Sequence, residues 1–88
     1  FASNIVTIST VYPGAAPSEV ENSVTKEIED AIASLEGIKS IQSTSLENIS
    51  IVTIELSDKV DVDFSIQDAQ RKINAILSDL PEEVEPPS

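Results

Sequence analysis

Two kinds of hydrophobic periodicity alternate along this chain, and their order restricts the folds it can adopt. Strand-like alternation of β-branched residues occurs at 4–12, 38–45 and 49–57, and a helical spacing of three and four occurs at 17–35 and 61–79. The predicted order is therefore strand, helix, strand, strand, helix. Because 88 residues can bury only one small core, we expect a single two-layer domain.

The periodicity also predicts which side chains face the core. In the first strand Val6, Ile8 and Tyr12 share one face, and Thr7 and Ser9 share the other. The remaining core-facing side chains are expected at Val52, Ile54 and Leu56 of the third strand, at Val20, Val24, Ile28, Ala31, Ile32 and Leu35 of the first helix, and at Ile66, Ala69, Ile73, Ile76, Leu77 and Leu80 of the second helix.

Turn and cap signals mark the ends of these segments. Pro13-Gly14 predicts a type II turn, and Gly37 is placed as a left-handed cap after the first helix. The Leu46-Glu47-Asn48 connection suits an antiparallel hairpin, and Asp61 is placed to cap the second helix.

The order of elements is that of the ferredoxin-like split β-α-β-β-α-β sandwich, an α+β fold, without its fourth strand. Pro81 ends the second helix, so we expect one domain at 1–80 and an extended, acidic, Pro-rich linker at 81–88 that leads toward that strand. The fourth strand would lie beside the first. The first strand is thus predicted to have an open edge, closed by self-association with another chain or by the tail of the same chain.

The composition argues against several functions. Sixteen acidic and five basic residues give a net charge of −11, which disfavours nucleic-acid binding. Without histidine or cysteine the usual nucleophile and general-base sets cannot form, so we predict no enzyme activity and no cofactor. An acylphosphatase would need an arginine in the PGAAP loop, but the sole arginine is Arg71. The aspartates at 58, 61 and 63 lack the glycine and closing glutamate of a calcium loop, which favours helix capping over a metal site.

Four segments in order resemble one protein family. They are the Tyr12-Pro-Gly-Ala-Ala-Pro-Ser-Glu-Val-Glu stretch, the Gly37 to Ser45 run, the segment from Val62 through Gln70-Arg-Lys-Ile-Asn74, and Leu80-Pro-Glu-Glu-Val-Glu-Pro-Pro87. Together they look like the first periplasmic porter subdomain, or pore subdomain, of resistance-nodulation-division (RND) efflux transporters. The sequence looks closer to the hydrophobe/amphiphile exporters than to the heavy-metal exporters.

The resemblance implies a functional setting for the chain. It implies a soluble periplasmic part of a proton-driven, homotrimeric multidrug antiporter of the bacterial inner membrane, with a periplasmic adaptor and an outer-membrane channel as further partners. By position, Gln67, Gln70, Arg71 and Asn74 would face the central pore, while Ser9 and Ile51 would line the substrate pathway.

One departure from the family pattern concerns the loop before the second helix. Many relatives have Gly-Thr-Asp there, whereas this chain has Lys59-Val60-Asp61. The alternative hypothesis is a free-standing regulatory module of the same fold that binds a ligand or partner at its open sheet face.

Overall fold

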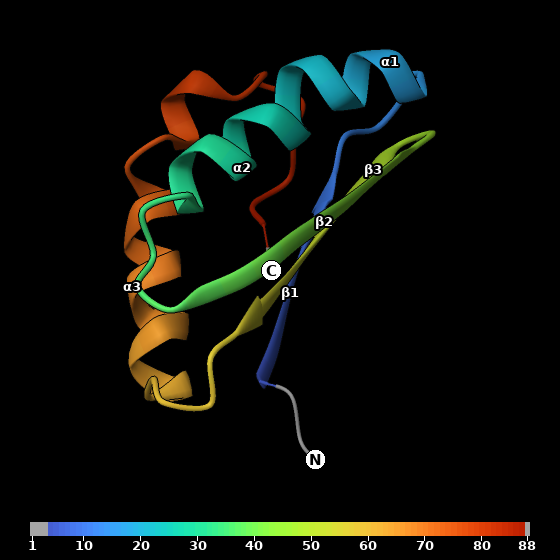
Figure 1. Ribbon diagram of the computed structural model, residues 1–88. Coiled ribbons are helices and arrows are strands. Elements are labelled where there is room, and N and C mark those ends of the chain that lie inside the picture. The colour runs from blue at the N-terminus through green and yellow to red at the C-terminus, as the bar shows by residue number, and fades with distance from the viewer. Residues whose placement is uncertain (1–3, 88) are drawn as a thin grey trace.

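The computed structural model describes residues 4–87, which form a three-stranded sheet covered by helices (Figure 1). The elements in chain order are β1 (Asn4–Val11), α1 (Pro17–Val20), the π-helical turn η1 (Glu21–Thr25), α2 (Lys26–Ile32), β2 (Ile38–Leu46), β3 (Ile49–Leu56), α3 (Val62–Asn74) and the 3-10 turn η2 (Leu77–Asp79). This α+β order is the predicted one.

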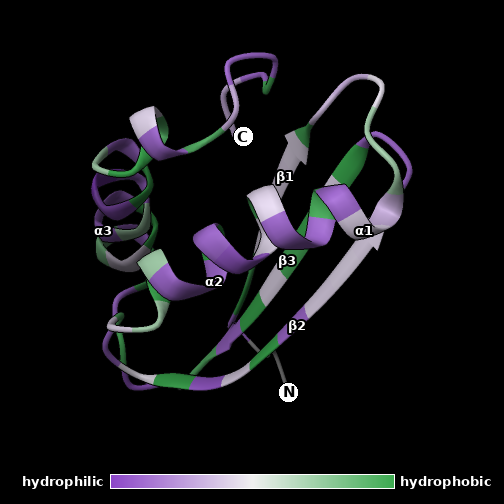
Figure 2. Cartoon of the chain, turned by 90° about the horizontal axis from the view of Figure 1, so that it is seen from above, coloured by the Kyte–Doolittle hydropathy of each residue, from purple (hydrophilic) through white to green (hydrophobic). Residues whose placement is uncertain are grey.

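The sheet is antiparallel throughout, with β3 in the centre in the order β1-β3-β2. Both helical segments lie on the same face of the sheet, and α2 contacts α3 there (Figures 1 and 2). The two layers and the strand order are those of the split β-α-β-β-α arrangement. In this arrangement β1 and β2 are the edge strands.

The two faces of the sheet differ as the alternation predicted. Val52, Ile54 and Leu56 of β3 are almost fully buried under the helices, together with Ile8 of β1. The intervening residues, such as Ile51 and Thr53, lie on the open face and are half-buried. Figure 2 shows this alternation of hydropathy along the strands.

The first helix is continuous from Pro17 to Ile32 and carries a π-helical turn at its centre. Val20, Val24, Ile28 and Ile32 have no exposed surface, so the predicted stripe is confirmed. The helix ends earlier than the predicted Leu35. Leu35 is nevertheless buried, because the turn that follows the helix brings it back into the core.

The last residue of the π-helical turn, Thr25, points inward and takes part in a polar seam between helix and sheet. The hydroxyl of Thr25 lies 2.8 Å from that of Ser45 and 2.7 Å from that of Ser50. Ser45 in turn donates to the Glu21 carboxylate over 2.7 Å, and Ser43 donates to Glu29. The seam fixes the helix over the hairpin by directional bonds in addition to apolar contact.

The second helix begins as predicted and ends early. Asp61 caps it, because its carboxylate accepts hydrogen bonds from the backbone N–H groups of Asp63 and Phe64. The helix stops at Asn74, short of the predicted residue 79, and a 3-10 turn follows. This change of helix type turns Leu77 outward, so it is 39% exposed and not part of the predicted core stripe.

The corner between β1 and α1 is tied to the β2–β3 turn. Pro13-Gly14 forms the predicted tight turn, with Gly14 at φ 82° and a hydrogen bond from the Ala15 N–H to the Tyr12 carbonyl. The Gly14 N–H donates to the side chain of Asn48, which has φ 69°. The Tyr12 hydroxyl donates to Glu19, and burial together with this hydrogen bond and the Glu19 charge raises the pKa of the Tyr12 phenol.

The segment expected to be an extended linker folds back toward the sheet. A turn joins the Pro81 carbonyl to the Val84 N–H, and Val84 packs against the core. The next residue, Glu85, donates its N–H to the Val11 carbonyl over 2.9 Å. The tail therefore touches the outer edge of β1 at one point.

The glycines at 14 and 37 provide a matched pair for testing local strain. Both have φ 82°, but a Cβ at Gly14 would meet no atom, whereas one at Gly37 would collide with the Val60 side chain. Gly37 thus has positive φ as predicted, although it lies immediately before β2 and well after the helix end.

We predict that Gly14→Ala costs about 1–2 kcal/mol of unfolding free energy from left-handed strain alone, and that Gly37→Ala costs more. Urea unfolding measures both. In a Val60→Ala background the cost of Gly37→Ala should fall to that of Gly14→Ala, and an unchanged cost would contradict the collision.

Candidate functional site

The open face of the sheet is organised in rows by the strand register. Each row takes one residue from β1, one from β3 and one from β2, and the rows change in polarity along the strands. They are Val11–Ile49–Leu46, Ser9–Ile51–Thr44, Thr7–Thr53–Gln42 and Ile5–Glu55–Ser40. The face thus grades from an apolar row near the hairpin turn to a polar row, and then to a mixed row at the far end.

The two residues predicted for the substrate pathway lie in one row. Ser9 is directly opposite Ile51, and Thr44 pairs with Ile51 on its other side. Both Ser9 and Ile51 are half-buried by their neighbours on the sheet and are not covered by a helix. This row presents two hydroxyls around one apolar side chain, a combination suited to amphiphilic molecules.

The charged end of the open face is already paired. Glu55 carries the one carboxylate among the described residues of this face. It accepts a hydrogen bond from the Ser40 hydroxyl over 3.2 Å. Lys39 lies 4.0 Å away from it, and both side chains are substantially exposed. An exposed pair of this kind contributes little stability and leaves the carboxylate free to exchange partners.

The four residues predicted to face a pore all lie on the exposed side of α3, but they divide into two groups. Gln70 and Asn74 line a groove between α3 and β1, whereas Gln67 and Arg71 are not among the residues that line it. Arg71 forms an ion pair with Asp68 over 2.8 Å. The sequence pattern gave no reason to separate the two groups.

Phe64 belongs to this outer side of α3 and was missed by the sequence reasoning. Its side chain is 55% exposed, and the Arg71 guanidinium stacks over its ring at 5.8 Å from the centroid. An exposed phenylalanine outside the apolar stripe of a helix is the signal that could have identified it. The stacked pair makes a flat, partly apolar surface on α3.

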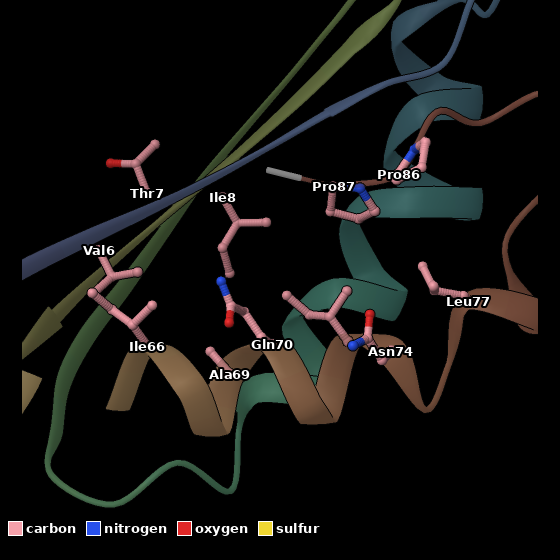
Figure 3. A pocket seen from close by; sticks show the side chains of 11 residues that line it. Val6, Thr7, Ile8, Ile66, Ala69, Gln70, Asn74, Leu77, Pro86 and Pro87 are labelled. Atoms are coloured by element: carbon pink, nitrogen blue, oxygen red, sulfur yellow. The ribbon is translucent and has the colours of Figure 1, made fainter. Parts of the chain in front are cut away.

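The groove between β1 and α3 has a volume of about 280 Å³ (Figure 3). Its lining is mainly apolar, with two amides at the side of α3. The amides belong to Gln70 and Asn74. The apolar part of the lining comes from Val6, Ile8, Ile66, Ala69, Ile73 and Leu77. Pro86 and Pro87 of the tail lie across one end of it.

Metal-ligand groups and membrane-spanning helices were looked for among residues 4–87. No three histidine, cysteine, aspartate or glutamate residues within 4–87 are grouped so as to hold a metal ion. No helix in that range is long and apolar enough to cross a bilayer.

Comparison with known proteins identifies the class to which this chain belongs. Residues 1–88, the whole chain, match the AcrB/AcrD/AcrF family. The chain is a member of that family of membrane-associated RND-type transporters, as its four sequence segments indicated.

Individual relatives agree with this assignment. The chain is 40% identical over 82 residues to the swarming motility protein SwrC of Bacillus subtilis, which covers 93% of the chain. It is 36% identical over 84 residues to an uncharacterized transporter of Haemophilus influenzae, covering 96%. It is 38% identical over 81 residues to the nickel and cobalt resistance protein CnrA of Cupriavidus metallidurans, covering 92%. The match takes up 8% of the length of each relative.

The division of α3 into a buried and an exposed side leads to a stability prediction. Ile73→Ala should cost about 2–5 kcal/mol, because Ile73 belongs to the buried cluster. Gln67→Ala should change stability by less than about 0.5 kcal/mol, because the side chain is exposed and forms no hydrogen bond within the described residues. Urea unfolding of both variants measures the difference, and a large loss for Gln67→Ala would mean that the helix faces are misassigned.

Proposed function

We propose that this chain is the first periplasmic porter subdomain of a proton-driven RND efflux transporter, and that it contributes surfaces to the substrate path without catalysing a reaction itself. The proposal rests mainly on one observation: this member of the transporter family has a sheet that is covered by helices on one face only. All helices cover one face, and the other presents graded rows of apolar and hydroxyl side chains. A face of this composition is suited to packing against, or forming a cleft with, another part of a larger protein.

The proposed cargo is amphiphilic and organic. Ile51 supplies an apolar contact at the centre of its row, and Ser9 and Thr44 flank it with hydroxyls. The name of CnrA refers to nickel and cobalt, whereas that of SwrC refers to swarming motility. The names of relatives therefore do not fix the cargo, and the proposal rests on the chemistry of the open face.

The outer side of α3 is proposed to line a central pore in a homotrimer. Gln67 and Arg71 lie on it, and Arg71 is held over Phe64 by stacking and by its ion pair with Asp68. A side that is polar but bears a flat aromatic surface suits contact with two further copies of itself around an axis. A periplasmic adaptor and an outer-membrane channel remain predicted partners of the full transporter.

The cargo proposal can be tested in the full-length transporter. Ile51→Ala should lower the efflux of an amphiphilic organic cation by roughly tenfold, since losing several methylenes from an apolar contact has an effect of this order. Efflux from cells with matched transporter levels is the measurement. Asp30→Ala, an exposed change on the helical layer, is the control and should leave efflux unchanged. Equal efflux by the Ile51 variant and the parent would refute a substrate role for the open face.

The pore proposal predicts contact between copies of α3. In a cysteine-free full-length background, Gln67→Cys should form disulfide-linked dimers on mild oxidation, because three copies of α3 around an axis bring the thiols together. Non-reducing electrophoresis detects them. Ser34→Cys, exposed in the turn after α2, is the matched control and should remain monomeric. Cross-linking at position 34 and none at position 67 would place a different surface at the axis.

A further inference from the structure

A row of small hydroxyl residues crosses the covered face of the sheet. The strand register places Thr10 of β1 directly opposite Ser50 of β3, and Ser50 opposite Ser45 of β2. Thr10 and Ser50 are each only 1% exposed, although both carry polar side chains. Buried hydroxyl groups need hydrogen-bond partners, because their transfer out of water is otherwise unfavourable.

The direction of each hydrogen bond in this region follows from the carboxylate at one end. Ser45 donates its single proton to Glu21 over 2.7 Å, so it can only accept a hydrogen bond from Thr25 at 2.8 Å. The Thr25 proton is thereby used, and Ser50, at 2.7 Å, must donate to Thr25. The hydrogen-bond series therefore runs one way, from Ser50 through Thr25 and Ser45 to Glu21.

Thr10 is left out of this hydrogen-bond series. Its buried hydroxyl has no hydrogen-bond partner within the part of the chain that the structure describes. Ser50, its neighbour across the ladder, has given its proton to Thr25 but keeps a lone pair that can accept a further hydrogen bond. A donor is therefore wanted at Ser50, and both a donor and an acceptor are unused at Thr10.

The ladder geometry keeps these two hydroxyls apart. The Tyr12 N–H donates to the Asn48 carbonyl, so these two residues form a hydrogen-bonded pair of the ladder. Thr10 and Ser50 lie two residues further along each strand and form the next pair of this type, whose Cα atoms are about 5.5 Å apart. No direct hydrogen bond joins their hydroxyls. Two buried polar groups separated in this way are characteristically bridged by a water molecule.

We propose that Thr10 and Ser50 hold one buried water molecule, which connects β1 to the polar seam. The water donates one hydrogen bond to Ser50 and forms a second with Thr10, so the hydrogen-bond series extends from β1 to Glu21. Thr25 by itself ties the helix to β2 and β3. With the water in place, all three strands are tied to the first helix by directional bonds.

Water fits this site better than a metal ion does. The position between the two hydroxyls requires a group that donates to Ser50, and a cation cannot donate a hydrogen bond. The carboxylate of the series, Glu21, contacts Ser45 at the other end, so a cation beside Thr10 would meet neutral hydroxyls. No three acidic residues within 4–87 are grouped to hold a metal ion.

The water site lies directly behind the surface proposed to contact the cargo. Thr10, Ser50 and Ser45 are the chain neighbours of the three residues in the open-face row that contains Ile51. The inference nevertheless does not rest on the proposed function, because the hydrogen-bond series belongs to the fold of the chain and its tests involve no transport.

Magnetic relaxation dispersion of the water oxygen nucleus tests the site directly, because it registers long-lived bound water and does not sense exchanging hydroxyl protons. In the 88-residue chain, Thr10→Val should remove one long-lived water. Thr7→Val, the same change on the open face of β1, should remove none. Thr10→Ser keeps the hydroxyl and should keep the water. A parent chain without a long-lived water, or an equal number in the parent and Thr10→Val, would overturn the proposal.

The sign of a stability change gives a second readout. Valine has nearly the shape of threonine, so Thr10→Val removes the hydroxyl without opening a cavity. The urea midpoint should fall, because the bridging hydrogen bonds are lost and Ser50 keeps an acceptor without a donor. A hydroxyl that binds no water would give the opposite sign, since replacing an unpaired buried polar group with an apolar one is favourable. A raised midpoint for Thr10→Val would therefore contradict the proposed water.

A double-mutant cycle tests the bridge between the two positions. Thr10→Val and Ser50→Ala each remove a partner of the same water, so their combined loss in urea midpoint should be smaller than the sum of the single losses. Thr7→Val combined with Ser50→Ala is the matched control and should be additive. Additive effects for the Thr10 and Ser50 pair would mean that no water joins these two side chains.

Discussion

The fold depends on one packing interaction, between the apolar stripe of the first helix and the covered face of the central strand. Val20, Val24, Ile28 and Ile32 are completely buried, and so are Val52 and Ile54 of β3 beneath them. Burial of each such side chain contributes about 1.5–3 kcal/mol. Since α3 joins this core beside α2 through Ala69 and Ile73, all helical cover is concentrated on one face of the sheet. The same interaction therefore leaves the other face free to act as a binding surface.

The apolar contact alone would allow the helix to slide along the sheet, and the polar seam opposes this. Thr25 bonds to serines of both β2 and β3, and Glu21 and Glu29 reach serines of β2 from the same helix. The π-helical turn at 21–25 gives Thr25 its inward position. Such buried or half-buried bonds have strict geometry, so they fix the register of the helix over the hairpin and, through it, the alignment of the rows on the open face.

Much of this architecture was predictable from the sequence, and the exceptions have physical causes. Hydrophobic residues that recur at every second position located the three strands, and those that recur every three to four positions located both helices. These repeats follow directly from burial of one face of each element. The π-helical turn had no local signal, since it depends on contacts of Thr25 with residues 45 and 50. Leu77 was assigned to the core because its spacing fits an α-helix, whereas the chain changes to a 3-10 turn after Asn74.

The candidate site shows the same limit at the level of single residues. Ser9 and Ile51 share a row because strand register follows from the hydrophobic alternation, so their juxtaposition was within reach of the sequence. The polar residues of α3 were treated as one group because helical spacing places them within one arc. Their division into Gln70 and Asn74 at the groove and Gln67 and Arg71 outside it depends on where β1 and the tail lie. A tertiary contact, the return of the tail to Val11, thus assigns different surroundings to neighbours on one helix, and substitution of each pair should affect different properties of the transporter.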